Sequence, residues 1–391
     1  MTPAARVAAA IEVLDAVIAG SPAEQALTRW ARNSRYAGSK DRAALRDLVF
    51  DVLRQRRSAL WCSGQVEESG RALMTGLLCQ QPEGLTAFDG SRYGPVPLTS
   101  TETGALRDLA TAPEIIHADL PDLLVSAFRD ALGDDWLRTA KELRSRAAVH
   151  LRVNTLRASR DEAMSMLADE GIVTRQLGNV STGLEVVENP RRIARSQAYS
   201  KGLVELQDAS GQIATLAAGV SPGDAILDYC AGGGGKILAL AAAAGGTGRF
   251  VAHDVDNARM RDLPARADRA GISVECVSGD AISGSFDCVF VDAPCSGSGT
   301  WRRAPEGKWL LTPDRLAAYP NLQLDILSKA ARHLRPNGRL TYATCSLLPS
   351  ENTEVVKTFL DRYPNFTCLN EELLSVTAQC DGFCFAHFVK N

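Results

Sequence analysis

Two cysteines and one aspartate carry the side chains with the most evident chemistry in this sequence. Asp292 and Cys295 begin and end an Asp-Ala-Pro-Cys tetrapeptide after the apolar run 286–291, and Cys345 follows the strand-like run 339–343. Both runs are typical of buried parallel strands, and open α/β sheets hold their ligands at the carboxyl ends of such strands. We therefore expect Cys295 and Cys345 to share one crevice and to act on one pyrimidine ring.

These residue types suit the methylation of a cytosine at carbon 5, an atom that is a poor nucleophile. A thiolate that adds to carbon 6 makes the ring enamine-like, and carbon 5 then attacks an electrophilic methyl group. A carboxylic acid such as Asp292 would supply a proton at N3, and a base must later remove the proton on carbon 5. The residues alone leave open which cysteine attacks. For each thiol taken singly, the alternative is a buried cysteine that only packs.

A glycine-rich loop indicates a site for a nucleotide-like cofactor. The predicted strand 225–230 runs into this loop, and an Ala- and Leu-rich helix is predicted at 237–244. In such an arrangement glycines let the backbone approach a ligand and a helix N-terminus faces it, although an ordinary tight turn is the alternative. The loop residues are Cys230, Ala231, Gly232, Gly233, Gly234, Gly235 and Lys236.

Acidic residues at the ends of the following strands indicate the kind of cofactor. Asp254 follows a strand predicted at 249–253 and suits paired ribose hydroxyls, whereas Asp280 follows a strand predicted at 273–277 and suits an adenine amino group. Each acid alone is more often a helix cap or a turn residue, but acids at successive strand ends favour an adenosine-containing cofactor. Because no phosphate-binding pattern is present, S-adenosylmethionine fits better than NAD.

Periodicity predicts three domains. Apolar residues recur at helical spacing through residues 1–140, which predicts an all-helical domain. Residues 141–205 contain two predicted strands and a helix, which indicates a small α+β module. From 206 to 391 strands and helices alternate, which predicts a doubly wound, mostly parallel α/β sheet.

Composition bounds the class of protein and its partners. The net charge is −3, but residues 1–60 are basic, which suits RNA phosphates or, equally, a solvated helical face. No apolar run approaches the ~20 residues of a membrane span, and no secretory signal is evident. The ten cysteines have no repeating spacing, so we expect reduced thiols in a cytoplasm. Cys380 and Cys384 lack further zinc ligands at suitable spacing, so no metal is expected.

Three motifs together resemble the RsmB/Sun family of RNA cytosine-5 methyltransferases. They are the glycine loop, the Asp-Ala-Pro-Cys-Ser-Gly segment and the triplet Thr344-Cys345-Ser346 with Glu351-Asn352 after it. The resemblance covers at least residues 145–391, and the helical first domain looks like the RNA-binding fold of the antitermination factor NusB. It implies a Rossmann-like, S-adenosylmethionine-dependent methyltransferase domain that acts on small-subunit (16S) ribosomal RNA, and we expect a monomer.

The resemblance also implies roles for individual residues. Cys345 would be the nucleophile and Cys295 would assist release of the product, with Asp292 and Lys236 completing the catalytic set. Contacts to S-adenosylmethionine would come from the glycine loop and from Asp254, Asp280 and Asp292. In DNA cytosine methyltransferases the Pro-Cys thiol attacks, so that analogy would give the nucleophilic role to Cys295 instead.

The glycine loop departs from the family pattern at one place. Members usually have Ala-Pro where this chain has Gly232 and Gly233. Loss of that proline removes backbone restriction worth roughly 0.4–1 kcal/mol. We expect a looser loop and a retained activity.

The segment after Cys295 contains the predicted RNA contacts. Its cations suit phosphate and its two tryptophans, at 301 and 309, suit stacking on unpaired bases, although each tryptophan could equally anchor a core. A paired cytosine would have to be extruded to reach the thiol. The cationic residues are Arg302, Arg303 and Lys308.

Two rival functions belong to other classes. A non-catalytic RNA-binding or ribosome-assembly protein could keep this fold, but the presence of both cysteines, Asp292 and Lys236 argues against it. A DNA cytosine-5 methyltransferase is the second rival, and the Thr-Cys pair at 344–345 argues against that one.

Overall fold

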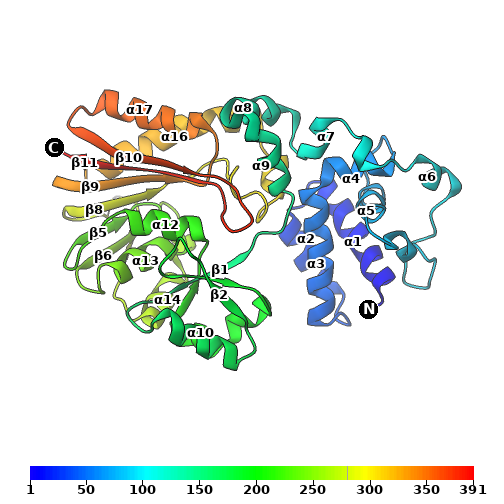
Figure 1. The fold of residues 1–391 in the computed structure, drawn as a ribbon, viewed down its shortest axis with the longest axis horizontal. Helices are drawn as coiled ribbons and strands as arrows, with labels where there is room; N and C mark the ends of the chain where they lie inside the picture. Colours follow the sequence, from blue (N-terminus) through cyan, green and yellow to red (C-terminus); the bar gives the residue numbers. More distant parts are fainter. Residues whose placement is uncertain (280) are drawn as a thin grey trace. The chain divides into compact units, whose positions relative to one another are not determined.

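The computed structural model describes residues 1–279 and 281–391 of the chain (Figure 1). These residues form two compact units. One consists of Met1–Arg146 with Trp301–Leu311, and the other of Ala147–Thr300 with Thr312–Asn391. The sequence placed the first domain boundary near residue 140 but did not predict that an eleven-residue segment of the later chain packs with the helical unit.

The first unit is helical, and apolar residues between positions 7 and 88 that recur on one face of their helices meet in one core. Leu14, Val49 and Leu73 are each 0–1% exposed within this core. The Thr2 side chain caps the first helix by accepting from the Ala5 amide at 3.1 Å. The helices are α1 Pro3–Ile18, α2 Ala23–Asn33, α3 Ser39–Arg54, α4 Arg56–Ser63, α5 Gly70–Leu78, α6 Ser100–Ala105, α7 Glu114–Ala118, α8 Asp122–Leu132, α9 Trp136–Glu142 and α15 Glu306–Trp309, with 3-10 turns at Gly84–Ala87, Leu109–Thr111 and Gly133–Asp135.

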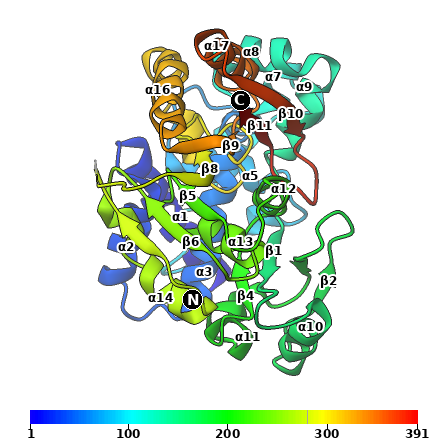
Figure 2. The same ribbon diagram turned by 90° about the vertical axis from the view of Figure 1, so that its left-hand side faces the viewer.

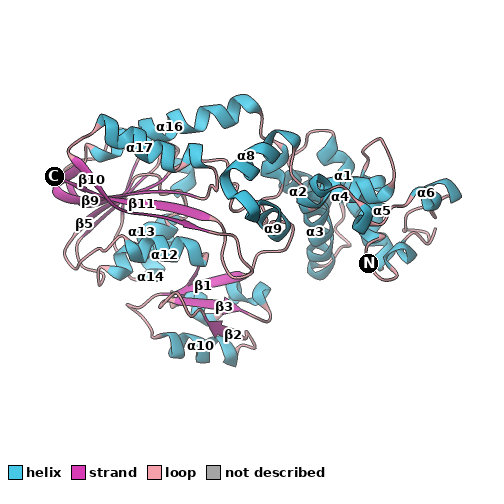
Figure 3. Cartoon of the chain, turned by 45° about the horizontal axis from the view of Figure 1, so that its top comes forward, coloured by secondary structure: helices cyan, strands magenta, loops and turns pink. Residues whose placement is uncertain are grey.

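The second unit begins with a small antiparallel sheet of order β2-β3-β1-β4, visible with α10 in Figure 3. Helix α10 starts at a capping box, in which the Ser159 and Glu162 side chains each accept from the other's backbone amide. The elements are β1 Val149–Val153, α10 Arg160–Asp169, β2 Thr174–Gln176, β3 Gly183–Val186, a 3-10 turn Pro190–Arg195, α11 Gln197–Ser200 and β4 Val204–Leu206.

The larger sheet of this unit has the order β10-β11-β9-β8-β5-β6-β7. Strands β9, β8, β5, β6 and β7 are parallel neighbours, as the alternating sequence pattern predicted. The last two strands are antiparallel, because the short connection between them allows a hairpin but no crossover. The strands are β5 Ala225–Asp228, β6 Arg249–His253, β7 Glu275–Val277, β8 Phe286–Asp292, β9 Leu334–Thr344, β10 Phe366–Leu374 and β11 Phe383–Lys390.

Helices cover both faces of the large sheet (Figures 1 and 2). Alternate residues of each strand point to opposite faces, so Ile226 and Phe290 pack against α12, α13 and α14, whereas Leu227 and Val289 pack against α16 and α17. The helices are α12 Ala209–Ala217, α13 Gly235–Ala243, α14 Leu263–Ala270, α16 Pro313–Ala331 and α17 Thr353–Arg362, with 3-10 turns at Asn257–Met260 and Pro349–Glu351.

The strand order places a topological switch point at β5. The chain builds outward from β5 to β6 and β7, then returns to the other side of β5 with β8 and β9. In open α/β sheets ligands bind at such a point, beyond the carboxyl ends of the strands. The candidate residues of the glycine loop and of the Asp-Ala-Pro-Cys segment follow β5 and β8, so the fold gathers them there.

None of the helices within the described residues combines the length and the apolar character that a membrane crossing requires.

Candidate functional site

Two thiols form the centre of the site. The sulfur atoms of Cys295 and Cys345 lie 3.3 Å apart, and both cysteines are free. Cys295 lies in the loop after β8 and Cys345 directly follows β9, and these strands are parallel neighbours. The two loops are joined by the backbone, since the Gly299 amide donates to the Cys345 carbonyl at 2.9 Å. The shared crevice expected from the sequence is therefore present for these two side chains.

The surroundings make the two thiols chemically unequal. A hydrogen bond from Cys295 lowers the pKa of Cys345 against the opposing effect of burial, and Thr300 and Lys236 lower it further. The same hydrogen bond, burial and the negative charges around it raise the pKa of Cys295 well above its usual range. Because the thiolate is the nucleophilic form, Cys345 is the better nucleophile of the pair.

A lysine and a carboxylate lie beside the thiols. Lys236, in the first turn of α13, donates to and forms an ion pair with Asp292, the last residue of β8. Burial works against the charged lysine, but Asp292 and Asp228 raise its pKa above the ordinary value. The Lys236 ammonium also lies 5.7 Å from the centre of the Phe383 ring. Lys236 therefore stays cationic and holds Asp292 next to the sulfurs.

Asp228, the last residue of β5, is a buried acid with an unused acceptor. Its Oδ2 accepts from the Ile237 amide at 3.1 Å, while its Oδ1 has no partner among the described residues. Burial, with the nearby charge of Asp292, raises the pKa of Asp228 to about 7 although Lys236 opposes the shift. A buried polar atom without a partner is rare, and here it lies where the glycine loop leaves the sheet.

The glycine loop has a backbone conformation that residues with side chains rarely adopt. Gly232 and Gly234 have φ values of +50° and +81°, and a Cβ at Gly234 would lie 2.1 Å from a methyl group of Leu263. The Gly232 amide donates to Asp254 at 2.9 Å, and Arg259 forms an ion pair with that buried carboxylate at 3.2 Å. The loop is thus fixed to the end of β6 at its first glycine, Gly232.

These groups fit a nucleoside cofactor. The glycines of the loop leave its backbone without side chains, a helix N-terminus follows the loop, and buried carboxylates lie at the ends of β5 and β6. Gly233 and Gly235 belong to this stretch without side chains. The Ala231 amide donates to the His253 carbonyl at 2.9 Å. Burial raises the pKa of Cys230, so this thiol is a packing group. Asp280, the predicted adenine contact, lies outside the described residues.

The predicted RNA contacts divide into two kinds. Arg303 is exposed, but Arg302 and Lys308 are each only 1% exposed inside the helical unit. The Lys308 ammonium donates to the Arg54 carbonyl at 3.0 Å, and burial lowers its pKa to about 8. Trp301 stacks on Phe128 with ring centres 5.6 Å apart. For Arg302 and Lys308 the predicted RNA contact is wrong. These buried cations hold the segment Trp301–Leu311 within the helical unit and present no charge to a phosphate.

Sequence reasoning missed three residues of the site. Asp228 lies inside the strand predicted at 225–230 and has no predicted role, and Thr300 has none either. Glu351 was quoted with its motif but given no role, although it is fully buried and bonded to both thiol loops. Its place six residues after Cys345 was the one available signal.

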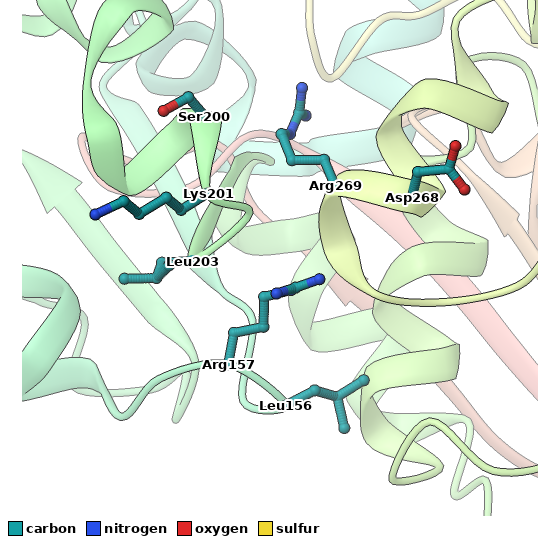
Figure 4. A pocket seen from close by; sticks show the side chains of 7 residues that line it. All are labelled: Leu156, Arg157, Ser200, Lys201, Leu203, Asp268 and Arg269. Carbon is teal, nitrogen blue, oxygen red and sulfur yellow. The ribbon is translucent and has the colours of Figure 1, made fainter.

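A second hollow lies elsewhere in the same unit, between the turn that follows β1, the end of α11 and the end of α14. Figure 4 shows its lining side chains, with Lys201 and Asp268 pointing away from one another. Arg269 is already bonded to Glu205, so this hollow offers no organised set of groups. Across the described ranges, no group of three or more His, Cys, Asp or Glu side chains is arranged to hold a metal ion. The hollow is lined by Leu156, Arg157, Ser200, Lys201, Leu203, Asp268 and Arg269.

Comparison with known proteins agrees with this fold. A family model described as 16S rRNA methyltransferase RsmB/F matches residues 215–383, and one described as the ferredoxin-like domain of RsmF/B-like methyltransferases matches residues 120–193. The ribosomal RNA small subunit methyltransferase B of Sodalis glossinidius is 31% identical over 397 residues, which cover 90% of this chain and 90% of that protein.

Two solved structures from Pyrococcus horikoshii have a similar fold over more than half of this chain. A methyltransferase homolog protein is 25% identical, with a TM-score of 0.63 over 71% of this chain and 98% of that one. NSun6, solved with SFG, is 18% identical, with a TM-score of 0.62 over 69% of this chain and 98% of that one.

The fold and the loop arrangement thus define a Rossmann-like methyltransferase, as the sequence predicted. The chain belongs to the RsmB/F family of 16S rRNA methyltransferases.

Proposed function

We propose that this protein methylates carbon 5 of a cytidine in small-subunit ribosomal RNA through a transient bond between Cys345 and the base. The methylation of ribosomal RNA follows from the family. The observation that carries the chemistry is the pair of sulfurs 3.3 Å apart beside the Lys236–Asp292 ion pair. A structural pair of cysteines would not require a partly buried cation and a carboxylate next to it.

The cofactor that fits is S-adenosylmethionine, which supplies an electrophilic methyl group when bound. The loop Cys230–Lys236 would hold it against bare backbone, and the Asp254 carboxylate would accept from the ribose hydroxyls. The free Oδ1 of Asp228 and the Asp292 carboxylate are further acceptors in the same crevice. Asp280 remains a proposed contact as well.

Cys345 would begin the reaction. The Cys345 thiol gives its proton to the Asp292 carboxylate, and the thiolate then gives an electron pair to carbon 6 and forms a carbon–sulfur bond. Asp292 passes that proton on to N3 of the ring and is again a carboxylate paired with Lys236. The electron pair of the carbon 5–carbon 6 double bond then becomes available at carbon 5 for the methyl group that bound S-adenosylmethionine would supply, and the methyl–sulfur bond of the cofactor would break to leave a neutral thioether. Lys236 keeps Asp292 in place throughout these steps.

Cys295 would end the reaction. Once Cys345 is bonded to carbon 6, its hydrogen bond and its negative charge no longer raise the pKa of Cys295, so Cys295 can release its proton to solvent and act as a base. It then takes the proton from carbon 5 while the Asp292 carboxylate takes back the proton from N3, the double bond forms again, and Cys345 leaves as a thiolate. The different pKa values of the two thiols thus suit their different roles as nucleophile and base.

Substitution of each cysteine tests this assignment. We expect Cys345→Ala to abolish transfer of labelled methyl groups to unmodified small-subunit rRNA. Cys295→Ala should instead accumulate a covalent protein–RNA species, because the product cannot be released. Both are measured by scintillation counting and denaturing gel electrophoresis. A covalent species formed by Cys345→Ala and not by Cys295→Ala would reverse the two roles.

The same assay separates the rival functions. Incorporation into DNA but not RNA would favour a DNA cytosine methyltransferase. No incorporation into any substrate at saturating cofactor would favour a non-catalytic RNA-binding or assembly protein.

The ten free cysteines suit a reducing cytoplasm, which we propose as the compartment.

A further inference from the structure

Glu351 is a buried carboxylate that lies between the two thiol loops. It ends the 3-10 turn Pro349–Glu351 and is 0% exposed. Its charge is held by hydrogen bonds, since no lysine, arginine or histidine of the described residues forms an ion pair with it. Burying a carboxylate costs free energy unless its oxygens accept several hydrogen bonds. The groups that surround Glu351 must therefore do more than pack against it.

One set of its bonds fixes the Cys295 loop. The Ser296 amide donates to Oε2 at 2.8 Å, and the Ser296 hydroxyl donates to Oε1 at 2.5 Å. Gln323 donates at 3.0 Å to Oε2 and at 2.9 Å to the Pro294 carbonyl, so it holds the residue on the other side of Cys295 as well.

The other set fixes the Cys345 loop. The Ser346 hydroxyl donates to Oε1 at 2.7 Å, so one carboxylate oxygen serves the residues that follow both cysteines. The Tyr342 hydroxyl donates to the Glu351 carbonyl at 2.6 Å, which ties the turn to β9. Ser298 extends the connection, with its hydroxyl 3.1 Å from that of Ser346.

We propose that Glu351 is a positioning residue that sets the distance between the two sulfurs and keeps their roles distinct. It does so through Ser296 and Ser346, each adjacent in sequence to one of the cysteines. Its negative charge also acts on one thiol of the pair, Cys295, and disfavours the thiolate there. The inference rests on the proposed function for its catalytic meaning, but the geometry of the thiols is independent of any substrate.

The first test measures thiol reactivity without RNA or cofactor. Alkylation by iodoacetamide, followed by peptide mass spectrometry from pH 6 to 10, gives the rate of each cysteine. In the wild type Cys345 should react before Cys295. In Glu351→Gln we expect the ratio of the two rates to fall at least about tenfold, the effect of a one-unit change in relative pKa. Glu354→Gln, which replaces an exposed acid three residues away, should leave the ratio unchanged.

The second test measures the reaction. Glu351→Gln should lower kcat roughly 100-fold, because a small displacement of reacting groups has an effect of that size. The KM for S-adenosylmethionine should change less than about twofold, since the residue lies at the thiols and not at the glycine loop. If Glu351→Gln folds poorly, Ser346→Ala removes one bond only and should move the alkylation ratio in the same direction.

The outcomes are distinct from those of the proposed function. A folded Glu351→Gln protein with an unchanged alkylation ratio and kcat would overturn the inference, and so would a loss of melting temperature alone. A wild type that transfers no methyl group would overturn the proposed function, whereas the alkylation ratio would still decide whether Glu351 controls the thiols.

Discussion

At the scale of single residues, neighbours decide what identical side chains do. Cys295 and Cys345 have the same thiol and nearly the same exposure, yet one pKa is raised and the other lowered. The direction of each pKa shift follows from the donors that the sulfur faces, because a hydrogen bond to the charged form stabilises that form. The pattern of residues had left the choice of nucleophile open, and these neighbours favour Cys345.

Asp228 provides a pH-dependent prediction at the same scale. Its pKa in the folded protein is about 7, above the ordinary 3.8, so the folded state holds this proton longer than the unfolded state. The associated stability is fully present below about pH 4 and is lost as pH rises through 7. We expect the wild type to lose up to about 4 kcal/mol between pH 4 and pH 8 that Asp228→Asn does not lose.

Urea denaturation of the cofactor-free protein at several pH values measures this difference. Asp262→Asn is the matched control, because that side chain is 77% exposed. Parallel stability curves for the wild type and Asp228→Asn would contradict the prediction. They would mean that Asp228 ionises as easily in the folded chain as in the unfolded one.

At the scale of elements, the glycine loop shows which backbone positions are constrained. Gly234 has φ +81° and no room for a Cβ, whereas a Cβ at Gly235 would have no neighbour closer than 4.0 Å. We expect Gly234→Ala to destabilise the protein by more than about 1 kcal/mol and to weaken S-adenosylmethionine binding at least tenfold.

Gly235→Ala should leave both properties nearly unchanged, because alanine favours the helix that begins there. Isothermal titration calorimetry and thermal unfolding measure the two effects. Equal affinities for the two variants would show that the left-handed conformation of the loop is not needed for the cofactor.

At the scale of the whole molecule, the chain does not divide into consecutive domains. The segment Trp301–Leu311 follows the loop that carries Cys295 and packs within the helical unit. There the Trp309 indole donates to the Leu53 carbonyl at 2.8 Å, and Arg54 donates to the Arg302 carbonyl at 2.7 Å. Glu306 accepts from the Ala23 amide at 3.0 Å.

Removal of residues 1–146 should therefore affect the loop that carries Cys295. In a chain of residues 147–391 the segment loses all of these partners, so its amides should exchange with solvent much faster than in the full chain. Hydrogen exchange with mass spectrometry compares peptides from residues 295–311 with peptides from β9, which should keep their protection. Equal protection of the segment in both chains would show that the helical unit does not support it.

The sequence determined the elements and the chemistry on their ends. Short-range patterns, such as the apolar runs before Asp292 and Cys345 and the glycines after 231, depend on neighbours in the chain and so can be recognised without the fold. The parallel sheet and the adjacency of Cys295 and Cys345 follow from such patterns, because parallel strands end at one edge.

Only the tertiary structure decided which charges face water and which residues hold the thiols. Arg302 and Lys308 look like RNA contacts in the sequence, yet they are buried by helices formed more than 240 residues earlier. Glu351 and Asp228 gain their importance from burial, which raises the energy of a charge and is a property of packing rather than of local sequence. Long-range packing therefore set the roles of these four residues.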